Sequence, residues 1–380
     1  MDFDYSDEQK MLKEGVERLI TERYQFESRK KYLKEEPGYS LAMWAQYADM
    51  GLLGLPFEER HGGSGGGAVE TMIVMEAFGR GLILEPYLAT VVLGGRTVQL
   101  AGNEAQRAAI LPKIANGSLK LAFAHSEPES RYNLADVSCT AKRDADGWIL
   151  DGTKSFVAHG DRADKLVVSA RIGGDRRGRD GIALFLVDAK APGVSCRGYP
   201  TQDGLRAAEI KLAGVKVGSN DALGDPGKAA AVIERVVDGA LAAIAAEAVG
   251  AMSAAHEITI DYLKTRKQFG AAIGSFQALQ HRAVDLFVQL EQARSMVYFA
   301  TMSVDDPDPA ERSKAISAAT VQIRKSGKFI GQQCIQLHGG IGMTLEYKIG
   351  HYFKRFTAME STFGDTDHHL AALARAGGLS

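Results

Sequence analysis

The sequence predicts an α+β protein in which a central β domain separates two helical domains. Apolar residues recur every three or four positions in the first 115 residues and again after residue 223, as in amphipathic helices. Between these blocks, short β-rich runs are divided by Gly, Asp and Pro. We therefore expect an N-terminal helical domain at residues 1–115, a β domain at 116–222 and a C-terminal bundle of long helices at 223–380.

Length and composition restrict the class of protein. The 380 residues are 45% apolar and 24% charged, as in an ordinary soluble globular chain. A net charge of −2 gives no reason to expect nucleic acid or a membrane as a partner. No apolar stretch approaches membrane-spanning length, the acidic N-terminus is unlike a targeting peptide, and three scattered cysteines form no CxxC pair. We expect a cytoplasmic protein without a disulfide framework.

The first helical block contains three helical patterns. Ser6 and Gln9 have the spacing of a capping box at the start of the first pattern. The second and third patterns cover SLAMWAQYADMGLLG and AVETMIVMEAFGRG. The loop RHGGSGGG between them lacks the Lys-Ser/Thr of a P-loop and follows no clear strand, so we interpret it as a flexible connection.

The central block has the spacing of a small antiparallel sandwich or barrel. Its candidate strands are LKLAFAH, VSCTAKR, GWILDGTKSFVA, KLVVSARI, GIALFLVD and AAEIKLAGVKV. The tripeptide ADG before Trp148 is typical of a hairpin turn. No helices alternate with these strands, which disfavours a nicotinamide-binding Rossmann unit.

The last block begins with one long Ala-rich helix. Its apolar stripe, at steps of three and four, is Leu241, Ile244, Ala248, Met252, Ala255, Thr259 and Tyr262. Two further long helices are predicted, one from about SFQALQH onward and one ending at CIQLHGG.

Several motifs in this order resemble the acyl-CoA dehydrogenase family. RKQFGAAIGSFQALQH (266–281) and QLHGGIGMTLEY (336–347) look like its two C-terminal signatures. SEP (126–128) and GTKSFVAHGDRAD (152–164) stand where the family has its two flavin-contacting segments. FGDTDHHL, GIALFLVD, TQDGLRAAE and LKTRKQFG together resemble the small subunit of pimeloyl-CoA dehydrogenase and related heteromeric members.

The resemblance implies a flavoenzyme that binds FAD between subunits, usually in a dimer of dimers. In this family a glutamate removes the α-proton of an acyl-CoA, the flavin takes a hydride from the β-carbon, and an electron-transfer flavoprotein accepts the electrons. The thioester carbonyl must be hydrogen-bonded, and the base must lie within reach of the α-proton. FAD is therefore the expected cofactor, with acyl-CoA and an electron-transfer flavoprotein as partners.

The resemblance assigns Arg266 and Phe269 to the pyrophosphate and adenine end of FAD, reached from the neighbouring subunit. A planar guanidinium can bond two phosphate oxygens and keeps its charge; the alternative is an exposed cation at a helix end. The same groove is expected to include Gln277, Gln336, Gly339 and Gly340. The two glycines allow close backbone approach, and a role as a helix C-cap is compatible with this.

At the positions expected to contact the flavin ring, this sequence differs from the family's usual residues. Phe123 and Ser126 replace a usual aromatic residue and a threonine, and Phe156 stands where Trp is usual. Ala158 occupies the position of a threonine whose hydroxyl bonds the flavin, which removes a hydrogen bond worth about 0.5–1.5 kcal/mol. SEPESRYNLAD takes the place of a glycine-rich loop.

Both positions that carry the family's base lack a carboxylate. Counting from Glu346 places the usual glutamate on Phe363, or on Gly364 if one residue is inserted. The second position, on the long helix, falls on Ala240. The resemblance therefore predicts a subunit that lacks the usual base.

Two nearby carboxylates have competing interpretations. Asp365 could act as a displaced base, or it could cap the last helix. Glu247 lies among alanines and is expected to pair with an Arg or Lys, because an unpaired buried carboxylate is costly. Glu360 is expected at the surface. His368 and His369 point to different helix faces and complete no ligand set, so no metal is expected.

Three functions remain open. The leading one is an acyl-CoA dehydrogenase subunit that works in an α2β2 complex with a base-carrying partner, or as a homo-oligomer. Flavin monooxygenases of the same fold also lack the glutamate, because they activate oxygen on reduced flavin. The third is a non-catalytic structural subunit.

Overall fold

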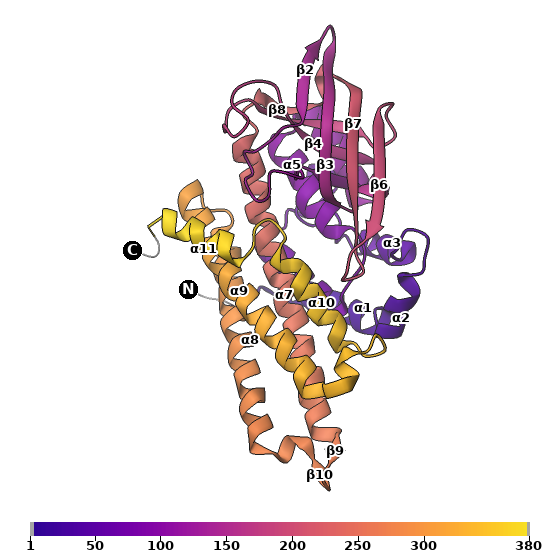
Figure 1. The fold of residues 1–380 in the computed structure, drawn as a ribbon. Coiled ribbons are helices and arrows are strands. Elements are labelled where there is room, and N and C mark those ends of the chain that lie inside the picture. The colour runs from indigo at the N-terminus through magenta and orange to yellow at the C-terminus, as the bar shows by residue number, and fades with distance from the viewer. Residues whose placement is uncertain (1–3, 378–380) are drawn as a thin grey trace. The chain divides into compact units, whose positions relative to one another are not determined.

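The computed structural model describes residues 4–377, which form two compact units. The described residues of Met1–Lys31, Ala68–Ile83 and Leu241–Ser380 form a helical unit. Tyr32–Gly67 and Leu84–Ala240 form a sheet unit. Figure 1 traces the chain through both units. The helices are α1 (Asp7–Arg23), α2 (Phe26–Tyr32), α3 (Leu41–Asp49), α4 (Ala68–Gly81), α5 (Arg96–Ala101), α6 (Glu104–Ala115), α7 (Ala230–Thr265), α8 (Gln277–Ser303), α9 (Pro309–His338), α10 (Ile349–Glu360) and α11 (Thr366–Arg375).

Local signals explain where several helices begin. Ser6 and Gln9 form the predicted capping box before α1, which satisfies backbone N–H groups of its first turn. Asp308 caps α9, and Pro309 follows at a position where a missing N–H costs nothing. The Ala-rich stripe predicted in α7 is buried from Leu241 to Thr259. The predicted capping box and the predicted stripe are thus confirmed.

Two glycines allow α4 and α7 of the helical unit to cross closely. A Cβ on Gly79 of α4 would lie 1.9 Å from the carbonyl oxygen of Glu247. A Cβ on Gly250 of α7 would lie 1.8 Å from that of Glu76. Because neither distance is possible for a real side chain, this crossing requires glycine on both helices.

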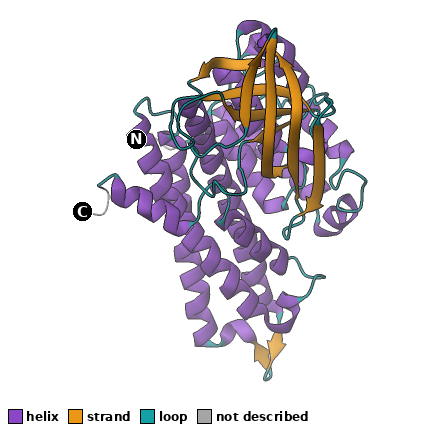
Figure 2. Cartoon of the chain, turned by 45° about the horizontal axis from the view of Figure 1, so that its top comes forward, coloured by secondary structure: helices purple, strands orange, loops and turns teal. Residues whose placement is uncertain are grey.

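The sheet unit contains one mixed sheet of eight strands (Figure 2). Its path is β6-β7-β3-β2-β4-β5-β8, and β1 pairs with β4 off this path. The strands are β1 (Leu121–Ala124), β2 (Thr140–Asp144), β3 (Gly147–Ala158), β4 (Lys165–Arg171), β5 (Ile182–Asp188), β6 (Val194–Pro200), β7 (Arg206–Gly218) and β8 (Ala222–Gly227). Most pairs are antiparallel, but β1 and β2 both pair with β4 in parallel. The predicted ADG turn joins β2 to β3.

The predicted order of helical, β and helical segments is confirmed, and so is the α+β fold class. Sequence periodicity missed α2, α5, α6 and a π-helix at Leu88–Gly95. Three of these elements are short or nearly continuous in apolar residues, and α6 contains an internal proline, Pro112, so the amphipathic signal is weak. The proposed division at residues 115 and 222 stays a prediction.

Among residues 4–377, α7 is the helix long and apolar enough to cross a membrane. Within the protein, however, 94% of its most apolar window is buried. Because its most apolar part is covered by the rest of the protein, α7 is a core helix of this fold.

Candidate functional site

A β-bulge in the sheet unit exposes Phe156. Between Lys154 and Val157 of β3 the pairing with β7 advances by only two residues, from Ile210 to Ala208, so one residue of β3 is left over. Phe156 lies there with φ of +50° and is 51% exposed. Bulges commonly redirect a side chain near a binding site. The bulge thus exposes Phe156, one of the residues expected to contact the flavin.

The two predicted flavin-contacting segments lie side by side in the sheet unit. The backbone N–H of Ser155 donates to the carbonyl of Ser126 over 2.9 Å, joining SEP to GTKSF. Ser126 is half-buried and Ala158, paired with Ala207, is also half-buried. Phe123 differs, because it is only 6% exposed and stacks on His125 within the unit.

A fully enclosed ion pair lies next to these segments. The Nζ atom of Lys154 is 2.7 Å from Oε1 of Glu127, and it also donates to the carbonyl of His125 and to Oγ of Ser169. Glu127 further accepts from the backbone N–H groups of Ser138 and Cys139. Every polar atom of the pair thus has a partner, which a buried ion pair requires.

This network sets the charge of its titratable members. Burial alone would raise the pKa of Glu127, but the Lys154 charge and the hydrogen bonds to the carboxylate outweigh burial and lower it. Burial and the Lys154 charge lower the pKa of His125 to about 3, so this histidine is neutral at pH 7. The segment that contains Ser126 is therefore anchored by one negative and one positive charge.

In the helical unit, the segment after α7 presents Arg266 and Phe269 at the surface. Lys267–Gln268 and Ala271–Ala272 form a two-residue hairpin, β9 and β10, with Phe269 at its turn. Phe269 has φ of +55° and is 94% exposed, and it contacts Phe276 edge to face. Arg266 and Gln277 are exposed as well. A bare aromatic ring beside a cation suits a nucleotide ligand.

An aromatic cluster holds the two C-terminal signatures together. The ring of His338, the last residue of α9, stacks on Tyr262 of α7 at 4.4 Å and contacts Tyr347 at 5.1 Å. The Tyr262 hydroxyl donates to the His338 carbonyl over 3.3 Å. The exposed hairpin after Tyr262 and the exposed glycines after His338 therefore belong to one surface. His338 itself is buried.

The glycines of the second signature leave open space around the backbone. Gly339 has φ of +63°, and a Cβ added to Gly339 or Gly340 would meet nothing within 4 Å. Gln336 is exposed on the last turn of α9. The open backbone of the two glycines, the amides of Gln277 and Gln336 and the guanidinium of Arg266 are hydrogen-bond donors of the kind that bind a diphosphate.

The loop at the expected base position is tightly held. The Arg324 guanidinium donates to the carbonyls of Thr362, over 2.7 Å, and Gly364. Phe363 lies between them, half-buried, with φ of +56°. Gly364 packs against His369, because an added Cβ would lie 2.6 Å from Nε2 of that ring. The loop therefore leaves space for a side chain at residue 363 but not at residue 364.

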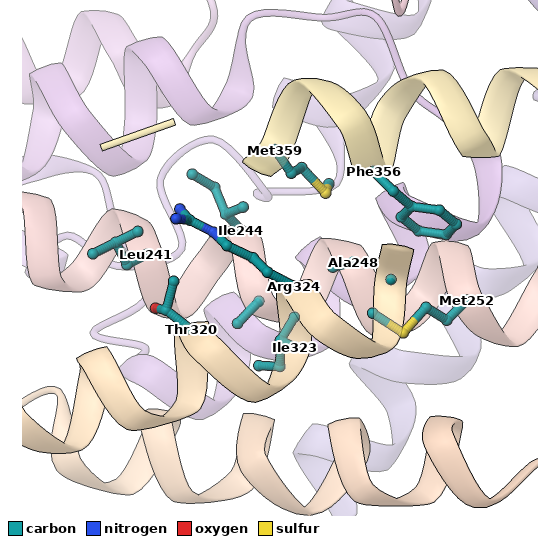
Figure 3. A pocket seen from close by; sticks show the side chains of 11 residues that line it. Leu241, Ile244, Ala248, Met252, Thr320, Ile323, Arg324, Phe356 and Met359 are labelled. Carbon is teal, nitrogen blue, oxygen red and sulfur yellow. The ribbon is translucent and has the colours of Figure 1, made fainter. Parts of the chain in front are cut away.

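Below this loop, α7, α9 and α10 enclose a small apolar cavity of about 20 Å³ (Figure 3). The Arg324 side chain lies among apolar residues that include Ile244, Phe356 and Met359. A cavity of this size has room for about one water molecule and none for an acyl chain. We therefore do not assign the acyl group to it.

The neighbouring acidic residues have structural partners. Asp365 caps α11 by accepting from the backbone N–H of His368 over 2.7 Å, as the capping interpretation predicted. Glu247 forms a buried two-point pair with Arg355, with distances of 2.7 and 2.8 Å, which confirms the predicted pairing. Glu360, expected at the surface, is half-buried and accepts hydrogen bonds from Thr366. Ala240, the second expected position of the base, is fully buried in α7.

Sequence reasoning missed Lys154, Glu127 and Arg324 as site residues. Arg324 stands in the buried stripe of α9 beside Ile323 and Gly327, whereas Lys154 and Glu127 have polar neighbours along the chain and give no such signal. A charge at an expected core position is the signal that could have identified Arg324. Within residues 4–377, no group of three or more His, Cys, Asp or Glu could hold a metal ion.

Comparison with known proteins accounts for most of the chain. Models of the acyl-CoA dehydrogenase N-terminal, middle and C-terminal domains match residues 6–118, 122–215 and 230–378. The "Caffeyl-CoA reductase-Etf complex subunit CarC" of Acetobacterium woodii is 32% identical over 323 residues, which are 83% of this chain and 84% of CarC.

Two solved structures are similar over nearly the full length. A variant of the "Tcur3481-Tcur3483 steroid ACAD" is 32% identical with a TM-score of 0.87, covering 98% of this chain and 99% of the other. The "FAD complex of PigA" is 25% identical with a TM-score of 0.92, and the match covers 100% of both chains.

Proposed function

The chain belongs to the acyl-CoA dehydrogenase family, and on that premise we propose that it is an FAD-binding subunit that desaturates an acyl-CoA thioester together with a partner chain. The family consists of oxidoreductases, and the cofactor expected from the sequence is the one named in the PigA complex. The subunit role rests on the residues of the loop at 362–366.

The residues present fit FAD. Arg266, Gln277 and Gln336 would bind the diphosphate, Gly339 and Gly340 would let it approach the backbone, and Phe269 would cover the adenine. Ser126 and Phe156 would lie against the ring system. The exposed guanidinium of Arg266 and the exposed aromatic rings of Phe156 and Phe269 support this proposal.

The proposed reaction removes a proton from the α-carbon and a hydride from the β-carbon, leaving a double bond between them. FAD, when bound, supplies the hydride acceptor. A base must take the α-proton, and in this chain Phe363 and Ala240 stand at both family positions of that base. Neither side chain can accept a proton, and Asp365 is engaged as a helix cap.

This loop is the observation that carries the proposal. Arg324 and His369 hold residues 362–364 in a fixed conformation, yet the side chain presented there is phenylalanine. A retained loop without its base is what a subunit would have if a partner supplied catalysis. The name of the similar Tcur3481-Tcur3483 structure joins two proteins, which supports a second dehydrogenase subunit as a partner. CarC is named as a subunit of an Etf complex, which supports an electron-transfer flavoprotein as the other partner.

We accordingly propose an acyl-CoA substrate, an electron-transfer flavoprotein as electron acceptor and a second acyl-CoA dehydrogenase subunit in an α2β2 assembly, with a homo-oligomer as the alternative. The scattered cysteines favour the reducing cytoplasm.

Anaerobic mixing tests the proposal. The purified chain is mixed with a panel of acyl-CoA thioesters while flavin absorbance is followed, first alone and then after co-expression with the candidate partner. Slow or no bleaching alone, and rapid bleaching with the partner, are expected. Rapid bleaching by the chain alone would overturn the missing-base proposal, unless Asp365→Asn abolished it, which would identify a displaced base.

The same mixtures separate the two alternatives. A flavin monooxygenase would show no bleaching with acyl-CoA in either mixture; its flavin would be bleached only by an added reductant and would react with oxygen once air is admitted. A purely structural subunit would purify without flavin while the complex retains it in the partner. Flavin content per chain distinguishes these outcomes before any turnover is measured.

A further inference from the structure

The helical unit contains a second, larger cavity that the proposed function does not use. Its volume is about 400 Å³, within the range of small-molecule pockets, about 300–1,000 Å³. Residues of α1, α2, α4, α7 and α10, and of the turns beside them, line it. Much of the lining is apolar or aromatic, including Ile20, Phe26, Ala254, Ile258 and Tyr352.

The charged side chains of this cavity are paired, with one exception. Arg80 binds Glu257 through two hydrogen bonds of 3.0 and 2.7 Å. Glu17 pairs with Lys13 one turn away on α1. Lys348, which precedes α10, donates to the carbonyl of Arg80 over 3.1 Å and lies 5.1 Å from the centre of the Tyr352 ring. No carboxylate in residues 4–377 forms an ion pair with Lys348.

The surroundings of Lys348 disfavour its charge. Burial, followed by the positive charges of Arg29 on α2 and Arg80 on α4, lowers the pKa of Lys348 to about 8. The Tyr352 hydroxyl does not compensate, since it donates to the same Arg80 carbonyl over 2.6 Å. A protein gains stability when such an uncompensated cation meets an anion of matching shape.

We propose that this cavity binds a small organic monocarboxylate, whose carboxylate pairs with Lys348 and whose apolar body packs against Ile20, Phe26 and Ile258. The proposal does not depend on FAD or on acyl-CoA turnover. It stands on a ligand-sized space, an apolar lining and one cation left without a counter-charge.

The charges at the cavity also exclude other anions. Glu17 and Glu257 line it together with Lys348, so a dianion such as phosphate would meet two carboxylates and only one unmatched cation. A single carboxylate matches the one charge of Lys348, whereas a dianion places one further negative charge beside Glu17 and Glu257. The apolar lining further favours a ligand with a hydrocarbon body over an inorganic ion.

Isothermal titration of the full-length protein with hexanoate tests the proposal, with 1-hexanol as the neutral probe of similar body and inorganic phosphate as the dianion. We expect hexanoate to bind at least tenfold more tightly than either control. In Lys348→Met, hexanoate binding should weaken at least tenfold, whereas Lys325→Met, at an exposed position of α9, should leave it unchanged. Ala254→Leu should weaken binding by filling the cavity while keeping the charge.

Near-ultraviolet circular dichroism checks that each variant keeps its tertiary structure. If Lys348→Met does not fold, Ala254→Leu and the comparison of hexanoate with hexanol still decide the matter. Equal binding of hexanoate and hexanol, equal binding by the wild type and a folded Lys348→Met or Ala254→Leu variant, or no binding of hexanoate in the millimolar range would overturn the proposal.

Discussion

The ammonium nitrogen of Lys154 lies 2.7 Å from Oε1 of Glu127, and the two side chains are 0% and 1% exposed. Lys154 belongs to β3, two residues before Phe156, and Glu127 follows Ser126 directly. The pair therefore connects the two segments that we propose to lie against the flavin. Removing one partner would leave a buried charge without compensation, whereas removing both would not.

Lys154→Met should accordingly lower the free energy of unfolding by about 3–5 kcal/mol. Glu127→Gln should cost a similar amount, and the double variant Lys154→Met, Glu127→Gln should cost less than the sum of the two single changes. Urea denaturation at pH 7 measures all three. The surface variant Lys142→Met on β2 provides a matched control. If the single variants lost less than about 1 kcal/mol, the pair would not be anchoring this region.

Two buried histidines predict a pH dependence of stability. The pKa of His125 and that of His369 are each lowered from 6.5 to about 3, chiefly by burial. Below about pH 6.5 the unfolded chain binds protons at both residues that the folded chain does not bind until about pH 3, so stability falls as pH falls through this window. Each histidine contributes about 1.4 kcal/mol per pH unit.

Urea denaturation at pH 7, 6 and 5 measures this slope. His369→Gln should reduce the slope of stability against pH by up to the amount that one bound proton contributes. At pH 7, where His369 is neutral, the change in stability should reflect only the lost packing and the lost contact with Ser317. An unchanged slope in the variant would mean that His369 is protonated in the folded protein.

Arg266→Ala should weaken FAD binding about 10- to 100-fold, the cost of losing a charged hydrogen bond of about 1.5–3 kcal/mol. The neighbouring Lys267→Ala, equally exposed on β9, is the matched control and should retain more cofactor. Flavin absorbance per chain after gel filtration measures retention. Raising the salt concentration should weaken wild-type binding, because screening acts on exposed phosphate contacts. Full FAD content in Arg266→Ala would remove this assignment.

The two candidate base positions should respond differently to a new glutamate. Residue 363 already carries a side chain at φ of +56°, so Phe363→Glu should fold and, with flavin and acyl-CoA bound, allow slow flavin bleaching. Gly364→Glu should be destabilised by about 1–3 kcal/mol, because φ there is +120° and the new Cβ would meet His369. Thermal denaturation and anaerobic bleaching compare them. Bleaching by Gly364→Glu alone would mean that the register is shifted by one residue.

The order of elements could be predicted because it depends on local patterns. The capping box at Ser6, the stripe along α7 and the turn between β2 and β3 each involve residues within a few turns of one another. The residue types at 240, 363 and 364 come directly from the sequence, so the prediction that the usual base is missing needed no coordinates. The resemblance assigned Phe123 to the flavin side, and only the structure revealed that its strand is buried along its whole length.

The sequence by itself determined the order of helical and β segments and the family motifs, since period, cap and residue type are properties of contiguous chain. Only the tertiary structure decided which charges meet. Lys154 reaches a glutamate 27 residues away, and Arg324 reaches a carbonyl 38 residues away. Lys348 shares its cavity with residues of α1 and α4, and none of them is its counter-ion. The energy of a buried charge depends on its neighbours across the fold, which spacing along the chain does not encode.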